Sequence, residues 1–337
     1  MTNEHPFDLT KCVRPNILAL PPYTTMRDDY LDYANLSLLD ANENSFGPSI
    51  PVQEVASTVR HDAIKLKQLF CDLRNTTCDE QDAAVKPLAP ENVCLGVGSD
   101  ESIDLVIRAF CAPGKDKILI CPPTYGMYEV SAQVNNITVV TTNLDVDNGF
   151  ALRPEAINEA LDPLIKVVFI CSPANPTGNL ICRTEIMRVL EHPTWNGIVI
   201  VDEAYIDFAP GGSLARQVNK WPNLIISQLL NNLKGPYNMS ASTIALATAA
   251  LQPTGIALME ANKKAMIEQR ERLLRELPKV SGFAVPDNAT TAAVAHSLPG
   301  CVGSLRITVG TKEEVDNVLL QIQMALDQVY SGRGQTA

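Results

Sequence analysis

Two apolar runs in the middle of the chain are each followed by polar side chains that could do chemistry. Residues 167–170 (Val-Val-Phe-Ile) precede Asn175, and residues 198–201 (Ile-Val-Ile-Val) precede Asp202 and Tyr205. A carboxylate forms its strongest hydrogen bonds with charged donors, and an amide and a phenol can bond other polar atoms of the same ligand. Together these three side chains would form one polar site if the fold brings the two segments together.

Strands of a parallel sheet are the elements that must bring these residues together. Uninterrupted β-branched runs, separated by a helical stretch at residues 183–191, are typical of strands buried on both faces. Ligands of such sheets bind beyond the carboxyl ends of the strands. We therefore expect an α/β fold with Asn175, Asp202 and Tyr205 at one edge. Further strands are predicted at residues 117–121, 137–144 and 223–228. Helices are predicted at residues 154–161, 240–251 and 256–277. A last helix is predicted after Thr311, which begins a capping box.

A glycine-rich loop at residues 96–101 precedes an apolar helical pattern and is a candidate anion site. Ser99 is predicted as the N-cap, and free backbone N–H groups at a helix start can hold phosphate. An ordinary capped helix is the alternative, because Asp100 and Glu101 also favour a helix N-terminus. Tyr125 follows the predicted strand at 117–121 and could stack on a planar ring, or could simply be a core tyrosine.

Composition and charge exclude several classes of protein. With a net charge of −11 over 337 residues, a nucleic-acid footprint is not expected. No apolar run reaches membrane-spanning length and the start lacks a leader pattern, which favours a cytoplasmic location. The nine cysteines include no C-x-x-C pair and are expected to be reduced, mostly core thiols. The four histidines show no metal-ligand spacing, so no metal site is expected.

Several motifs carry a family resemblance. Residues 175–178 (Asn-Pro-Thr-Gly), followed by residues 202–208, resemble the pyridoxal-phosphate (PLP) transaminases of fold type I. Residues 39–44, 123–128, 236–238 and 305–311 narrow the resemblance to the histidinol-phosphate aminotransferase family. The resemblance implies a mostly parallel central sheet with helices on both faces, a smaller α+β domain and a homodimer. The implied division is an N-terminal arm with part of the small domain (1–50), a large PLP-binding domain (51–252) and a small C-terminal domain (253–337).

The resemblance also implies roles for individual residues in the exchange of an amino group between L-histidinol phosphate and 2-oxoglutarate. Asp202 would bond the pyridinium nitrogen of PLP, Asn175 and Tyr205 its phenolic oxygen, and Tyr125 would stack on the ring. The loop of Ser99, Asp100 and Glu101 would anchor the phosphate through main-chain donors, with the two carboxylates pointing away. Asp202 and Tyr205 would be catalytic, and the substrate would be bound by Tyr23, Asn42, Asn175 and Arg306. Tyr23 could instead be a packing aromatic, and Arg306 a surface ion-pair residue.

The chain departs from this family most seriously after the predicted strand at 223–228. Members of the family continue into a segment that holds the Schiff-base lysine and a phosphate-binding arginine, whereas this chain passes directly to Leu229, so one sheet segment is expected to be deleted. Two further departures lie at residues 60–67, where a cross-subunit tyrosine is absent, and at 281–303. Lys234 is the candidate substitute lysine, because it follows a strand's carboxyl end. The other lysines either precede strands (Lys115, Lys117, Lys166, Lys220) or belong to helical patterns (Lys263, Lys264, Lys312).

Two other readings stay open. One is a catalytically impaired relative that binds PLP or a partner subunit without turning over substrate. The other is a dinucleotide-binding dehydrogenase, which is disfavoured because the G-x-G-x-x-G pattern would need glycine where Glu101 stands.

Overall fold

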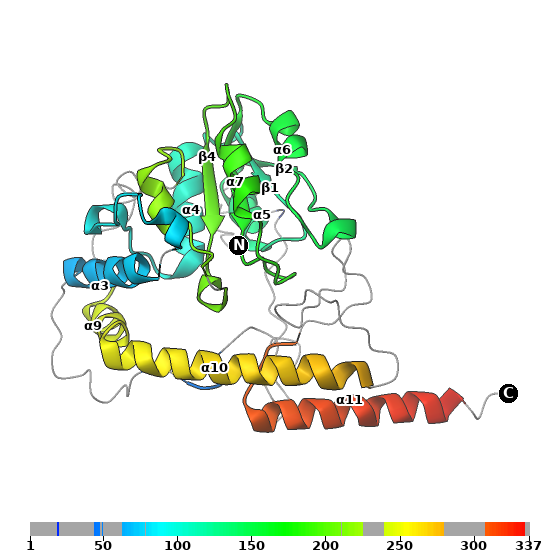
Figure 1. Ribbon diagram of the computed structural model, residues 1–337. Coiled ribbons are helices and arrows are strands. Elements are labelled where there is room, and N and C mark those ends of the chain that lie inside the picture. Colours follow the sequence, from blue (N-terminus) through cyan, green and yellow to red (C-terminus); the bar gives the residue numbers. More distant parts are fainter. Residues whose placement is uncertain are drawn as a thin grey trace, which may run out of the picture.

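The computed structural model describes residues 63–77, 79–209, 211–224, 239–279 and 307–333, together with residues 19, 44–47 and 49 (Figure 1). Four of the residues predicted to act in the site, Tyr23, Asn42, Lys234 and Arg306, lie outside these ranges. The expected sheet deletion after residue 228 also lies outside them.

A four-stranded parallel sheet forms the centre of the described chain. The strands are β1 (Lys117–Ile120), β2 (Thr138–Thr141), β3 (Ile165–Cys171) and β4 (Ile198–Asp202), in the order β2-β1-β3-β4. The strands predicted at 117–121, 167–170 and 198–201 are confirmed, and β2 is shorter than the predicted 137–144. Leu224 lies within the next predicted strand, at residues 223–228, and makes a parallel bridge to Val199 of β4.

Helices connect the strands and cover both faces of the sheet. α4 (Gly98–Phe110) precedes β1, α5 (Met127–Val134) joins β1 to β2, α6 (Pro154–Ala160) joins β2 to β3, and α7 (Arg183–Leu190) joins β3 to β4. Val167 and Phe169 of β3 pack with α4 and α5, whereas Val168 and Ile170 pack with α6 and α7. Successive side chains of a strand point to opposite faces, so each face has its own hydrophobic core and the predicted α/β class is confirmed.

The sequence near the helix ends explains where several helices begin. Pro154 occupies the first turn of α6, where its missing N–H leaves no hydrogen bond unmade. Ser240 accepts a hydrogen bond from Thr243 N and caps α9 (Ala241–Ala250). Before α11 (Lys312–Arg333), Thr311 N donates to Glu314 Oε2 and Glu314 N donates to Thr311 Oγ1, which confirms the predicted capping box.

Long helices lie to one side of the sheet. α3 (Ala63–Thr76) contacts α9, which leads into α10 (Pro253–Glu276), and α10 and α11 lie side by side (Figure 1). Leu273, Leu277 and Val315 form a small core between α10 and α11, beside an ion pair of Arg272 with Asp316. α10 begins at the first residue of the predicted C-terminal domain, whose boundary stays a prediction. No single helix of the described ranges could span a membrane, although the bent pair α9–α10 passes by length and composition.

Candidate active site

The carboxyl ends of β3 and β4 lie side by side and define the candidate site. Cys171, the last residue of β3, pairs with Asp202, the last residue of β4. Ser172 N donates to the carbonyl oxygen of Asp202 at 2.9 Å, so the pairing continues into the following loop. The segments that carry Asn175 and Tyr205 therefore leave the sheet at the same edge, as the sequence predicts.

The Asp202 side chain is held by two hydrogen bonds from different parts of the chain. Its Oδ2 atom accepts from the hydroxyl of Tyr128 at 2.7 Å, and its Oδ1 atom accepts from Ala204 N at 3.1 Å. A carboxylate has about four acceptor positions, so it can receive a further donor. A fixed carboxylate at a strand end can thus bind a cationic N–H group with charge-assisted strength.

Tyr128 is a site residue that the sequence reasoning missed. It is fully buried on α5, and its ring stacks on Phe169 of β3 with centroids 4.7 Å apart and planes 15° apart. Burial raises the pKa of the Tyr128 hydroxyl well above its ordinary value, and the neighbouring Cys171 and Asp202 raise it further. The hydroxyl therefore remains a proton donor to Asp202. Its spacing of three residues from Tyr125, across the start of α5, is the signal that could have identified it.

Tyr125 links the sheet edge to the start of α4. Its hydroxyl donates to Asp100 Oδ1 at 3.0 Å, and its ring makes an edge contact with Tyr128, with centroids 5.7 Å apart and planes at 88°. The ring is partly exposed rather than buried in the core. The ring packs against the core on the α4–α5 face of the sheet, and stacking on a bound heterocycle stays a prediction.

The start of α4 differs in two details from the sequence prediction. The helix begins at Gly98, and Val97 rather than Ser99 stands at the N-cap, without a side-chain cap. The Glu101 carboxylate does not point away: its Oε2 accepts from Val97 N at 2.5 Å. The reason is that a first-turn glutamate can satisfy a backbone N–H that the helix leaves unpaired. Gly98 has a φ of +74°, and the space where a Cβ atom would stand is open.

Asn175 and Tyr205 sit on short, hydrogen-bonded turns next to the strand ends. Asn175 N donates to Cys171 Sγ at 3.4 Å, which folds the loop after β3 back onto its own strand. Tyr205 stands at the start of a 3₁₀ turn, η6 (Ile206–Phe208), in which Phe208 N donates to the carbonyl of Tyr205. Their predicted contacts with a cofactor stay predictions.

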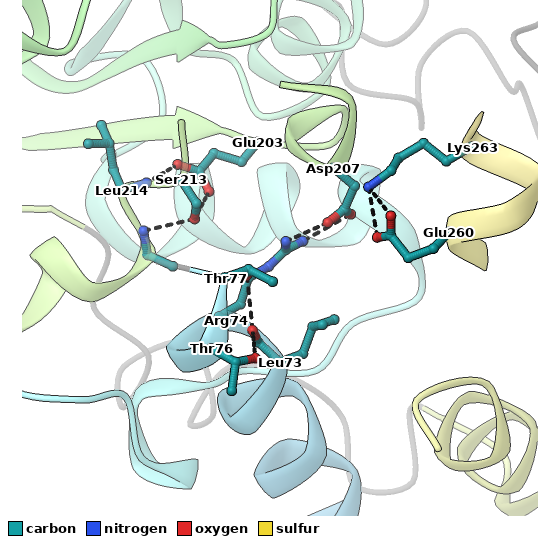
Figure 2. A network of polar contacts seen from close by, with 11 residues as sticks. Leu73, Arg74, Thr76, Thr77, Glu203, Asp207, Ser213, Leu214, Glu260 and Lys263 are labelled. Atoms are coloured by element: carbon teal, nitrogen blue, oxygen red, sulfur yellow. Dashed lines mark hydrogen bonds and ion pairs between the residues drawn. The ribbon is translucent and has the colours of Figure 1, made fainter. Parts of the chain in front are cut away.

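Two polar contacts that the sequence did not indicate tie the turn after β4 to the rest of the molecule (Figure 2). Arg74 of α3 makes two bonds to the carboxylate of Asp207, at 2.6 and 3.1 Å. Glu203 accepts from Ser213 Oγ at 2.8 Å and from Leu214 N at 2.5 Å. Because Tyr205 lies between Glu203 and Asp207, these contacts fix the backbone that carries it.

Glu203 gives a prediction about the pH dependence of stability. Burial raises the pKa of its carboxyl, and hydrogen bonds from Leu214 N and Ser213 Oγ only partly oppose the rise. A raised carboxyl pKa means that the fold binds the proton more tightly than the unfolded chain does, so stability is lost as pH rises from the ordinary value of about 4.3 through the folded-state pKa. Glu203→Gln, which keeps the shape without the charge, is expected to be more stable than the wild type at pH 7 in urea unfolding.

The same comparison should be repeated near pH 3.5, where the advantage of Glu203→Gln is expected to disappear because Glu203 is then protonated in both states. The exposed Glu159→Gln, on α6, serves as the matched control and should show no such pH-dependent difference. An advantage for Glu203→Gln that is equal at both pH values would contradict burial as the cause.

The described lysines occupy the positions predicted for them. Lys117 is the first residue of β1, and its amine donates to Asp162. Lys166 is the second residue of β3, and its amine donates to the carbonyl oxygen of Pro163. They therefore lie at the amino ends of the strands, opposite to Asp202. Lys263 and Lys264 belong to α10, and Lys263 pairs with Glu260 (Figure 2).

The six described cysteines, Cys71, Cys94, Cys111, Cys121, Cys171 and Cys182, are free thiols, and four of them are buried. The expected reduced state of the cysteines stays a prediction.

Comparisons with known proteins identify relatives along nearly the whole chain. A family model described as aminotransferase class I and II matches residues 39–228. A histidinol-phosphate aminotransferase of Schizosaccharomyces pombe is 41% identical and is aligned over 96% of this chain and 99% of its own length. The histidinol-phosphate aminotransferase of Saccharomyces cerevisiae is 40% identical and is aligned over 91% of this chain and 95% of its own length.

Solved structures show the same fold at lower identity. The histidinol-phosphate aminotransferase from Sinorhizobium meliloti in complex with pyridoxal-5'-phosphate aligns with a TM-score of 0.75 at 17% identity, over 94% of this chain and 98% of that one. An aspartate aminotransferase from Thermus thermophilus with maleate aligns with a TM-score of 0.73 at 17% identity. This alignment covers 93% of this chain and 99% of that one. The central architecture is thus that of the fold type I transaminases, as the resemblance implies.

The alignment with the Schizosaccharomyces pombe relative also bears on the shortened segments. It runs over 390 positions, more than the 337 residues of this chain, so at least 53 positions of the alignment have no residue here. The relative therefore contains sequence that this chain lacks, and the positions of the predicted deletions stay a prediction.

Proposed function

Because this chain belongs to the histidinol-phosphate aminotransferase family of class I and II aminotransferases, we propose that it catalyses the PLP-dependent transfer of an amino group between L-histidinol phosphate and 2-oxoglutarate. The family rests on 41% identity over nearly the full length of a relative. One feature of the fold carries the proposal: the Asp202 carboxylate, fixed at the carboxyl edge of the sheet by Tyr128 and Ala204 N.

The residues present fit a phosphorylated planar heterocycle. A phosphate can be held by main-chain N–H groups at a helix start, and α4 begins at Gly98, whose missing Cβ leaves open space. Asp202 offers a charged acceptor for a protonated ring nitrogen, and Tyr125 offers an aromatic face tied to Asp100 in the first turn of α4. These features support assigning the cofactor contacts to the loop of residues 99–101 and to Tyr125, Asn175, Asp202 and Tyr205.

PLP, when bound, supplies the electron sink that transamination requires. Asp202 would keep the ring nitrogen protonated through a charge-assisted hydrogen bond. Asn175 would donate an amide N–H and Tyr205 a phenol O–H to the oxygen on the ring. Tyr125 would exclude water from one face of the ring. Arg306, Tyr23 and Asn42 would bind the substrate, with Arg306 offering its planar fork to a carboxylate or phosphate.

A non-catalytic relative is the alternative, although the relatives support the enzyme. Transamination needs an amine that moves a proton at the reacting carbon, and a positioned acid–base group contributes about 10² to 10⁴ in rate. Lys117 and Lys166 lie at the opposite end of the sheet from Asp202. If Lys234 does not supply the amine, the chain would bind PLP through the same residues without turning over substrate.

One experiment separates the two candidates. The protein is incubated with PLP, reduced with borohydride, digested and mapped by mass spectrometry. If the chain turns over substrate, the covalent label is expected on Lys234 and should be lost in Lys234→Arg, while Lys220→Arg, which changes a lysine packed on Trp221, retains it. Binding of PLP with no labelled lysine would identify the non-catalytic candidate.

We further propose a cytoplasmic homodimer that takes small-molecule substrates. The location is supported by the free thiols of the described cysteines, because disulfides are rare in the cytosol. The dimer is supported by the family resemblance. Sedimentation velocity of the purified chain would test it.

A further inference from the structure

Tyr128 connects three parts of the candidate site through one buried side chain. Its hydroxyl bonds Asp202 at 2.7 Å, its ring face stacks on Phe169, and the ring of Tyr125 meets it edge to face. Phe169 belongs to β3 and Asp202 to β4, so a single residue of α5 contacts two neighbouring strands and the segment before its own helix.

The surroundings of Tyr128 leave it one orientation. The side chain has no exposed surface, and it lies in the core formed by Val167 and Phe169 of β3 with residues of α4 and α5. A ring packed at core density cannot turn without moving its neighbours. The hydroxyl is therefore presented to Asp202 in a fixed direction.

The direction of proton donation is equally fixed. Besides Asp202, the hydroxyl has the Cys171 thiol as a side-chain partner. Burial raises the pKa of Cys171 to about 12, so this thiol carries no charge at neutral pH. The Tyr128 hydroxyl therefore donates, and the Asp202 carboxylate acts as the acceptor.

We propose that Tyr128 is the positioning residue of the site, whose hydroxyl orients the Asp202 carboxylate toward the cofactor ring while its own ring orients Tyr125. This proposal rests on the proposed function, because that function supplies the cofactor ring to which Asp202 would bind. Without the hydroxyl, the Asp202 carboxylate loses the hydrogen bond to Oδ2 and keeps the one from Ala204 N to Oδ1, so the carboxylate can turn. In this role Tyr128 acts through Asp202 and touches no substrate.

The first test needs no cofactor. Tyr128→Phe keeps the ring and its stacking and removes only the hydroxyl. Hydrogen bonds to charged groups contribute about 1.5–3 kcal/mol, so the unfolding equilibrium constant is expected to rise at least about tenfold in the presence of Asp202 and less than about twofold in an Asp202→Ala background. Tyr125→Phe is the matched control: its hydroxyl bonds Asp100 instead, so its effect should be the same with and without Asp202. Equal effects of Tyr128→Phe in the two backgrounds would overturn the proposal.

The second test measures what a purely structural tyrosine would not change. With ¹⁵N-labelled PLP bound, the pH midpoint of ring-nitrogen protonation is expected to fall by about one unit in Tyr128→Phe, equivalent to 1.36 kcal/mol, and the affinity for PLP to fall about tenfold. An unchanged midpoint and affinity in Tyr128→Phe would overturn the orienting role. Failure of the wild type to bind PLP would instead refute the proposed function. The unfolding measurements with and without Asp202 would still decide whether Tyr128 holds Asp202.

Discussion

Asp202→Ala is expected to weaken the binding of PLP about 100-fold and to lower the transamination rate by about 10² to 10³. The carboxylate would make a charge-assisted bond to a ring nitrogen, and such bonds are worth about 1.5–3 kcal/mol, equivalent to one to two powers of ten in affinity. The rate falls further because electrostatic groups aimed at developing charge typically contribute 10² to 10³ each. Fluorescence titration with PLP and a coupled transamination assay would measure the two effects.

Two further substitutions separate charge from shape at this position. Asp202→Asn retains an acceptor oxygen for Tyr128 but loses the charge, so its affinity for PLP should lie about tenfold below that of the wild type. Asp147→Ala, which removes an exposed carboxylate of the 3₁₀ turn η5 (Val146–Asn148), is the matched control and should bind PLP normally. If Asp202→Ala also bound PLP normally, the site would have to lie elsewhere.

The strands and their edge were predictable from sequence because the signals are local. β3 and β4 each present an unbroken run of β-branched or aromatic residues, all buried except the partly buried Ile200, and such runs are typical of strands covered on both faces. Asp202, at the end of β4, and Asn175, four residues after the end of β3, then had to lie at the carboxyl edge. The capping box of α11 was predictable for the same reason, since Thr311 and Glu314 lie three residues apart.

The remaining contacts of the site depend on residues far apart in the chain. Tyr128 meets an aspartate 74 residues later, and Arg74 meets Asp207 across 133 residues. No local pattern encodes such partners, because any buried tyrosine or largely buried arginine has the same sequence signature until the fold is known. The start of α4 was misplaced for a different reason: Ser99 is a good N-cap by type, but the Glu101 carboxylate already bonds Val97 N.

The pattern of apolar residues in a helix is also not enough to identify the residues of the site. The sequence of α5 cannot tell which of its buried side chains, Tyr128, Ser131 or Ala132, uses a polar atom to bind a distant partner. Tyr128 differs from a core phenylalanine by one hydroxyl, and the hydroxyl alone reaches Asp202. The functional part of the core is therefore visible only when β3, β4 and α5 are assembled.

Phe169→Ala tests how far the site depends on that core, and it is expected to destabilise the fold by about 3–5 kcal/mol. Phe169 is fully buried, pairs with Ile120 and Ile200 on the neighbouring strands and stacks on Tyr128. The hydrogen-bonded strands on both sides keep the backbone from closing the cavity. Urea unfolding would measure the loss as a lower midpoint at an unchanged slope.

Phe208→Ala is the control for this substitution because it removes the same side chain from an exposed position. Phe208 is 44% exposed at the end of η6, so its truncation should cost less than about 1 kcal/mol. The cavity left by Phe169→Ala should also loosen Tyr128, because the ring loses the surface on which it stacks. A further Tyr128→Phe change in that variant should then cost less than it does in the wild type. A full cost there would mean that the hydrogen bond to Asp202, and not the packing on Phe169, is what holds Tyr128 in place.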